Sequence, residues 1–207
     1  YLAPDNLMTL KGKPAASNQA AVVTPEEKCR LMVLIVMCIF NIAFWMTFEQ
    51  MGNTFALWAD ADTDRHIGGW EVPASWFQSL NPFFIFALTP LVTSFWSRQA
   101  ARKTEMGSIT KMGWGCILLG GAFLIMIPAA AQYEVDGTPV SMFWLLGAVF
   151  TMTVGELYLS PVGLSMVTKL APARLVSMLM GLWFFSQFIG NSLAGYLGSF
   201  WDCIYKP

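Results

Sequence analysis

Two acidic residues, Glu49 and Glu156, stand inside long apolar runs of this sequence. A charged side chain at the centre of a bilayer costs at least about 2.5 kcal/mol, so an acid there needs a partner, a water-filled cavity or a proton. The same runs hold no lysine or arginine deep enough to pair with either acid. The two acids therefore predict binding of a cationic group or transfer of protons. A structural ion pair with another helix is the alternative.

The neighbours of Glu156 suggest a binding-site wall. Ser160 and Gly163 follow at helical steps on the same face, and Pro161 removes one backbone hydrogen-bond donor from that turn. An acid, a hydroxyl group and a proline near the middle of an apolar helix are typical of transport sites. We interpret Glu156 as a candidate substrate-binding residue.

Glu49 lies toward the C-terminal end of its apolar run. Asn41, Trp45 and Asn53 share its helical face at four-residue steps. This pattern predicts a polar face along one helix, with Glu49 in the outer half of the span, where its carboxylate can exchange a proton.

Two further polar positions lie inside apolar runs. Asn81 precedes Pro82. Its side-chain amide can contact a substrate, or it can donate to the backbone carbonyl that loses its hydrogen bond to the proline. Trp183 lies well inside the last run, where it lines a cavity or packs between helices. It begins a polar and aromatic face that continues through Gln187, Gly190 and Asn191.

The composition is that of a membrane protein, and the continuous apolar runs described below make the predicted fold class an all-α membrane protein. Hydrophobic residues make up 56% of the 207 residues and charged residues only 12%, about half the share in soluble domains. The net charge of −1 does not suggest a nucleic-acid partner. The chain opens at Tyr1 without a signal peptide, and we interpret it as a piece of a longer protein.

About five apolar runs are long enough to cross a bilayer as helices, which need about 20 residues each. They are continuous rather than alternating, which favours helices over barrel strands. Residues 1–28 precede them as a polar linker, and Thr24 and Pro25 mark the start of a helix. The predicted transmembrane bundle, residues 29–207, has spans at about 30–58, 75–97, 108–131, 141–169 and 174–200.

Basic residues predict how the spans are oriented. With five alternating spans, the linker and two of the connections fall on one side of the membrane, and they hold ten of the twelve basic residues. The positive-inside rule places that side in the cytoplasm. The ten residues are Lys11, Lys13, Lys28, Arg30, Arg98, Arg102, Lys103, Lys111, Lys169 and Arg174.

Small residues predict close helix packing. In the last run they recur at four-residue steps, a spacing that lets helix backbones approach. The positions are Gly190, Ala194 and Gly198, and we expect the same of Gly113, Gly120 and Gly121 in the third run.

The acids between the first two runs predict a solvated loop and no metal site. Asp60, Asp62, Asp64 and Glu71 match four positions of a calcium-binding loop, but Arg65 stands where that loop needs glycine. None of the four cysteines of the chain is at CxxC spacing.

Four segments of the sequence resemble the proton-dependent oligopeptide transporters, or POT family, of the major facilitator superfamily. Their order and spacing agree from Thr24 onward. The segments are FWMTFEQ at 44–50, FQSLNPFFI at 77–85, GELYLSPVGL at 155–164 and GLWFF at 181–185.

The resemblance implies the C-terminal half of a major facilitator fold, covering the seventh to eleventh helices of its core. The partner is then a missing N-terminal six-helix half. The implied function is proton-coupled symport of di- and tripeptides across the cell inner membrane, with the linker and basic loops in the cytoplasm. It needs no cofactor, because the proton gradient drives it.

The resemblance also implies roles for five residues. Glu156 would face the amino terminus of the peptide, or a lysine of the other half when the site is empty, with Ser160 beside it. Glu49 would pair with an arginine of the first helix and take part in proton coupling. Asn81 would hydrogen-bond the peptide backbone, and Trp183 would line a side-chain pocket.

Other functions compete with peptide transport. A proton symporter of the same fold could carry nitrate, a drug or an amino-acid derivative, although an anion gains nothing from Glu156. A membrane enzyme would need a nucleophile–base pair or metal ligands within the bundle, and the one histidine, His66, lies outside it. If the chain were an accessory membrane subunit, the presence of two acids inside apolar runs would remain unexplained.

Overall fold

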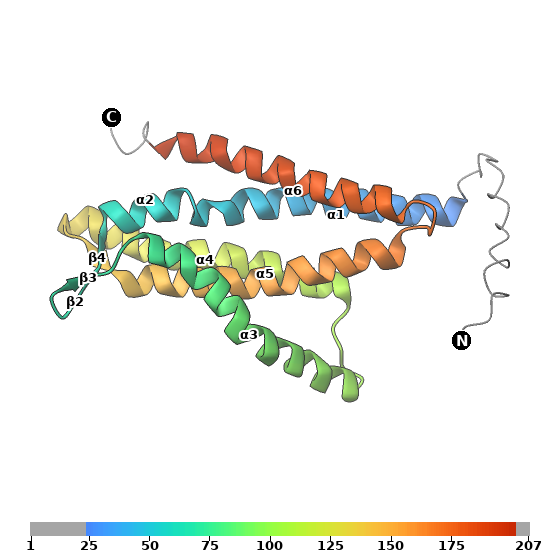
Figure 1. The fold of residues 1–207 in the computed structure, drawn as a ribbon, viewed down its shortest axis with the longest axis horizontal. Coiled ribbons are helices and arrows are strands. Elements are labelled where there is room, and N and C mark those ends of the chain that lie inside the picture. The colour runs from blue at the N-terminus through green and yellow to red at the C-terminus, as the bar shows by residue number, and fades with distance from the viewer. Residues whose placement is uncertain (1–23, 202–207) are drawn as a thin grey trace, which may run out of the picture.

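The computed structural model describes residues 24–201 and shows a bundle of long helices (Figure 1). Five of them are α1 (Pro25–Phe48), α3 (Ser75–Ala101), α4 (Ser108–Asp136), α5 (Met142–Leu170) and α6 (Val176–Ser199). The shorter helical pieces are η2 (Glu49–Met51) and α2 (Thr54–Ala61). The strands are β1 (Thr63–Asp64), β2 (His66–Ile67), β3 (Trp70–Glu71) and β4 (Val140–Ser141). The predicted all-α membrane fold is confirmed.

Four helical segments are long and apolar enough to cross a membrane within the part of the chain that the structure describes. Helix α6 has 24 residues, also above the length needed to cross a bilayer, and it carries the polar residues Gln187 and Asn191. The five predicted spans thus correspond to five helical stretches. The four segments are Pro25–Ala61, Ser75–Ala101, Ser108–Asp136 and Met142–Leu170.

The first span begins earlier and is less regular than predicted. Thr24 caps α1 by accepting a hydrogen bond from the Glu27 backbone, so residues 25–28 of the predicted linker are already helical. Residues 1–23 of that linker lie outside the described residues. The helix changes to a tight 3₁₀ turn at Glu49 before α2 starts, so the predicted single helix has a break beside the acid.

Close contacts pair α4 with α5 and α6 with α1. A Cβ atom added at Gly190 would lie 2.8 Å from the Ile42 carbonyl oxygen, which confirms the close packing predicted for this position and identifies α1 as the partner helix. The expectation for α4 is wrong, because nothing lies within 4 Å of such an atom at Gly113, Gly120 or Gly121. Gly115 allows the close approach instead, because a Cβ atom added there would lie 2.8 Å from the Gly155 carbonyl oxygen of α5.

Helix α3 leaves the bundle obliquely (Figure 1). It begins beside α5 and packs mainly on that helix. Phe77, in its first turn, is its one buried residue, and Pro82 and Pro90 lie further along it. The half of α3 that follows Pro82 diverges from the bundle (Figure 1), and a cleft lies between this half and α5.

The connection between α2 and α3 is more ordered than the predicted solvated loop. Arg65 forms ion pairs with Asp60 at 3.2 Å and Glu71 at 2.8 Å, and it also donates to the Val72 carbonyl. Asp62 is fully buried, so the prediction that all these acids are solvated is wrong for this one. The cation of Arg65 takes up two of the carboxylates that a calcium ion would need.

The basic connections meet at one end of the molecule. The start of α1, the α3–α4 connection and the α5–α6 connection all lie at the same end, and the β2–β3 hairpin and β4 lie at the other (Figure 1). Arg174 pairs with Glu27 at 2.9 Å, which ties the α5–α6 connection to the start of α1. The alternation of sides that the basic residues predict therefore agrees with the fold.

Candidate functional site

Glu156 and Asn81 meet between α5 and α3. The Asn81 Nδ2 atom donates hydrogen bonds to Glu156 Oε2 at 3.0 Å and to Thr153 Oγ1 at 3.2 Å. Thr153 is fully buried and donates its own proton to the Val149 carbonyl, so its oxygen is free to accept from Asn81. Asn81 thus orients the carboxylate of Glu156 rather than simply closing the kink at Pro82.

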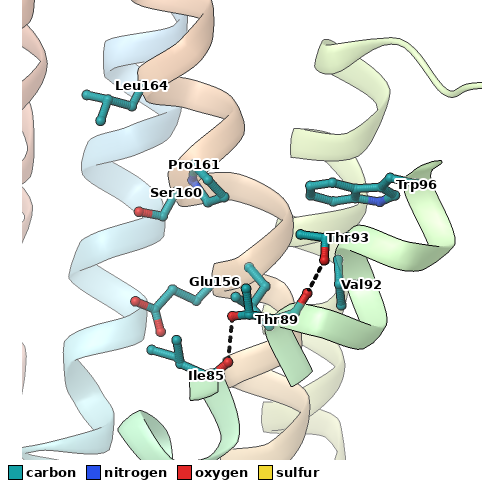
Figure 2. A pocket seen from close by; sticks show the side chains of 10 residues that line it. Ile85, Thr89, Val92, Thr93, Trp96, Glu156, Ser160, Pro161 and Leu164 are labelled. Carbon is teal, nitrogen blue, oxygen red and sulfur yellow. Dashed lines mark hydrogen bonds between the residues drawn. The ribbon is translucent and has the colours of Figure 1, made fainter. Parts of the chain in front are cut away.

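A cleft of about 340 Å³ opens beside this pair. Its size falls in the range of small-molecule sites. Glu156 and Ser160 are the polar groups that α5 contributes, and Figure 2 shows both side chains on the same side of that helix. The other lining residues are Leu157, Pro161 and Leu164 of α5, with Ile85, Thr89, Val92, Thr93 and Trp96 of α3.

Neither predicted acid has a cationic partner among residues 24–201, where every ion pair lies near an end of the bundle. Glu49 is half-buried in the η2 turn, and its charge is close enough to interact with that of Glu156. Two acids near each other without a cation favour a site that receives a positive group or a proton.

The polar face predicted around Glu49 has a different role. Asn41 is fully buried, donates to Ser186 Oγ at 2.9 Å and accepts from Trp45 Nε1 at 3.1 Å. Asn53 donates to the Ala194 carbonyl at 3.4 Å. These bonds join α1 and the turn after η2 to α6, and Glu49 takes no part in them. The shared helical face therefore does not join these residues to Glu49 in one network.

Trp183 is not brought together with the other predicted site residues. Its side chain is only 4% exposed and covers Gly163, where an added Cβ would overlap the indole ring. It does not line the cleft that holds Glu156 and Ser160. Its role in a side-chain pocket stays a prediction. Gly163 is explained by packing, because no larger residue fits beneath the ring.

Sequence reasoning missed Thr153 and Trp96. Thr153 lies three residues before Glu156 on the same helical face, a signal that could have identified it. Trp96 lies near the basic end of α3, where a tryptophan in the sequence suggests an anchor at the membrane–water interface. Its place in the cleft follows from the oblique path of α3, which the sequence does not indicate.

Comparison with known proteins gives consistent matches. The sequence model of the POT family matches residues 5–206. The peptide transporter YePEPT of Yersinia enterocolitica subsp. palearctica is 38% identical over 86% of this chain and 35% of its own length. Dipeptide and tripeptide permease A of Escherichia coli K12 is 28% identical over 92% of this chain and 36% of its own length.

A solved structure is also similar. The crystal structure of peptide transporter POT in complex with sulfate superposes with a TM-score of 0.78 at 33% identity, over 87% of this chain and 36% of that protein. The chain therefore spans about a third of the length of the relatives that it matches. The relatives are transporters of peptides by name, not enzymes.

Proposed function

This chain belongs to the POT family, and on that basis we propose that it forms part of a proton-coupled symporter of di- and tripeptides. Because it spans about a third of its relatives, we assign it the helices on one side of the transport pathway. An N-terminal half supplies the other side and the cationic partners of the two acids. The proton gradient drives transport, so no cofactor is needed.

The observation that carries this proposal is the cleft around Glu156. A peptide has a cationic amino group at one end, and a half-buried carboxylate without a cation is the group that would bind it. Asn81 holds that carboxylate and keeps its own amide oxygen available for a peptide N–H, and Ser160 adds a hydroxyl group nearby. Glu49 serves proton coupling, since it stands outside the hydrogen-bond networks of the bundle.

Uptake by the complete transporter tests this function. In proteoliposomes with an inward proton gradient, labelled alanyl-alanine should accumulate above its outside concentration, and a protonophore should abolish the accumulation. A tripeptide should compete for uptake, whereas nitrate should not. Accumulation that survives the protonophore, or competition by nitrate, would contradict the assignment.

The proposed location is the cell inner membrane, with the basic connections in the cytoplasm. Thr104 is exposed at the basic end and Thr138 at the opposite end. Single cysteines at these positions, with the four native cysteines replaced, should react oppositely with an impermeant maleimide in intact cells. Thr138→Cys should be labelled from outside and Thr104→Cys only after permeabilisation. Labelling of both from outside would refute the orientation.

A further inference from the structure

We propose that Trp96 forms the end wall of the peptide cleft and selects apolar side chains, and that Lys111 is a positioning residue that holds this wall in place. The inference rests on the proposed function, because it identifies which part of a peptide this end of the cleft binds. It concerns two residues outside the Glu156–Asn81 pair.

Trp96 and Glu156 line the same cleft from different helices. Figure 2 shows the Trp96 ring beyond Thr93 and Pro161, on the far side of the lining from the Glu156 carboxylate. The lining between them is mainly apolar, through Val92 and Pro161. An extended peptide advances about 3.3–3.6 Å per residue, so a peptide with its amino terminus at Glu156 directs a later side chain toward the indole.

No hydrogen bond fixes the indole ring. Its Nε1 atom is buried and has no hydrogen-bond partner in the described part of the chain. Two contacts hold the ring instead. Tyr158 of α5 meets it edge-on, with centroids 5.3 Å apart, and the Lys111 ammonium group of α4 lies 4.5 Å from its centroid. A cation at this distance from a tryptophan face is attracted by the ring quadrupole.

Lys111 is itself unusually constrained. Its side chain is 8% exposed, and Nζ lies 2.8 Å from Glu105 Oε1 in the α3–α4 connection. The hydrogen bond from Lys111, followed by its charge, lowers the pKa of the Glu105 carboxyl below its usual value. The Glu105 carboxylate is thereby favoured in its charged form beside Lys111. The ion pair supports the ring from the α4 side.

The position of this support explains its effect on the cleft. Helix α3 leaves the bundle obliquely and packs mainly on α5 (Figure 1). Lys111 is in the first turn of α4, so its contact with Trp96 links the departing end of α3 to the bundle. Loss of that contact should let the indole turn away from the cleft without removing Glu156, Asn81 or Ser160.

Selectivity between two dipeptides in the complete transporter tests the proposal. For Trp96→Ala, KM for alanyl-phenylalanine should rise about tenfold relative to alanyl-alanine, because an aromatic contact and its buried area are lost. Elution of Trp96→Ala as a single peak at the wild-type volume in size-exclusion chromatography shows that the variant folds. Lys111→Met should shift the ratio in the same direction by about threefold, the weaker effect expected for loss of a cation–π contact.

Lys111→Arg should restore the ratio, since a guanidinium group can both stack on the indole and pair with Glu105. Arg102→Met removes an exposed cation from the same connection and should leave the ratio unchanged. An equal rise in KM for both dipeptides, or a ratio that Lys111→Arg does not restore, would overturn this inference alone. Absence of uptake of either dipeptide by the unaltered transporter would overturn the proposed function and this inference with it.

Discussion

Replacement of Glu156 by glutamine is expected to weaken dipeptide binding to the complete transporter at least about 100-fold. Removal of one partner from a buried charge pair typically costs about 3–5 kcal/mol, because the other charge is left without compensation. Here the uncompensated charge would be the peptide ammonium group. Glutamine keeps the size of the side chain and can still accept the hydrogen bond from Asn81, so the local structure should persist.

Isothermal titration with alanyl-alanine measures this effect. Ser160→Ala is the matched change within the cleft. It should weaken alanyl-alanine binding less than about tenfold, the effect expected when one neutral hydrogen bond is lost. Glu26→Gln removes an exposed acid at the start of α1 and should not change the affinity. Wild-type affinity in Glu156→Gln would rule out the carboxylate as the site of the amino terminus.

Glu49→Gln is expected to abolish uphill accumulation of peptide while preserving counterflow. Glutamine cannot release or take up a proton, so peptide movement would no longer be linked to the gradient. Counterflow exchanges labelled for unlabelled peptide and needs no net proton movement. The expected division follows from the fold, since Glu49 stands in the η2 turn while Glu156 stands in the cleft. Protonation of Glu49 would bias which side of the cavity is open.

Both transport modes are measured in one liposome preparation, so that differences in protein content cancel. Glu71→Gln is the control, because that acid lies in the hairpin and pairs with Arg65 instead of facing a cavity. It should retain both modes. Accumulation above the outside concentration by Glu49→Gln would show that another group carries the coupled proton.

The sequence was sufficient to predict the helices and to single out Glu156 as the acid of the candidate site. Apolar length sets where a helix can cross, so each predicted span corresponds to a helical stretch, with ends that differ by a few residues. The high cost of an acid in an apolar run identified Glu156, and the structure places Asn81 and Ser160 with it. The free-energy cost of burying an acid can be judged from a single sequence, because it depends on the residue and on the apolar segment around it.

The sequence could not indicate which helix each polar face would meet. Asn41 and Trp45 lie on the same periodic face as Glu49, but their partner Ser186 is on α6, and the 3₁₀ turn at Glu49 interrupts the periodicity. Periodicity likewise could not distinguish Gly115, where an added Cβ atom would collide with α5, from Gly113, where it would meet nothing within 4 Å. Such contacts depend on how helices are arranged, and that arrangement is a tertiary property.

The most direct test of the central claim, that Glu156 binds the amino terminus of a peptide, compares alanyl-alanine with its N-acetylated form. Acetylation removes the positive charge and leaves the rest of the peptide intact. The unaltered transporter should bind the free amine at least about 100-fold more tightly, and Glu156→Gln should reduce that preference to within about tenfold. A preference of the same size in both proteins would contradict the claim, because the carboxylate of Glu156 would then not be the group that recognises the ammonium.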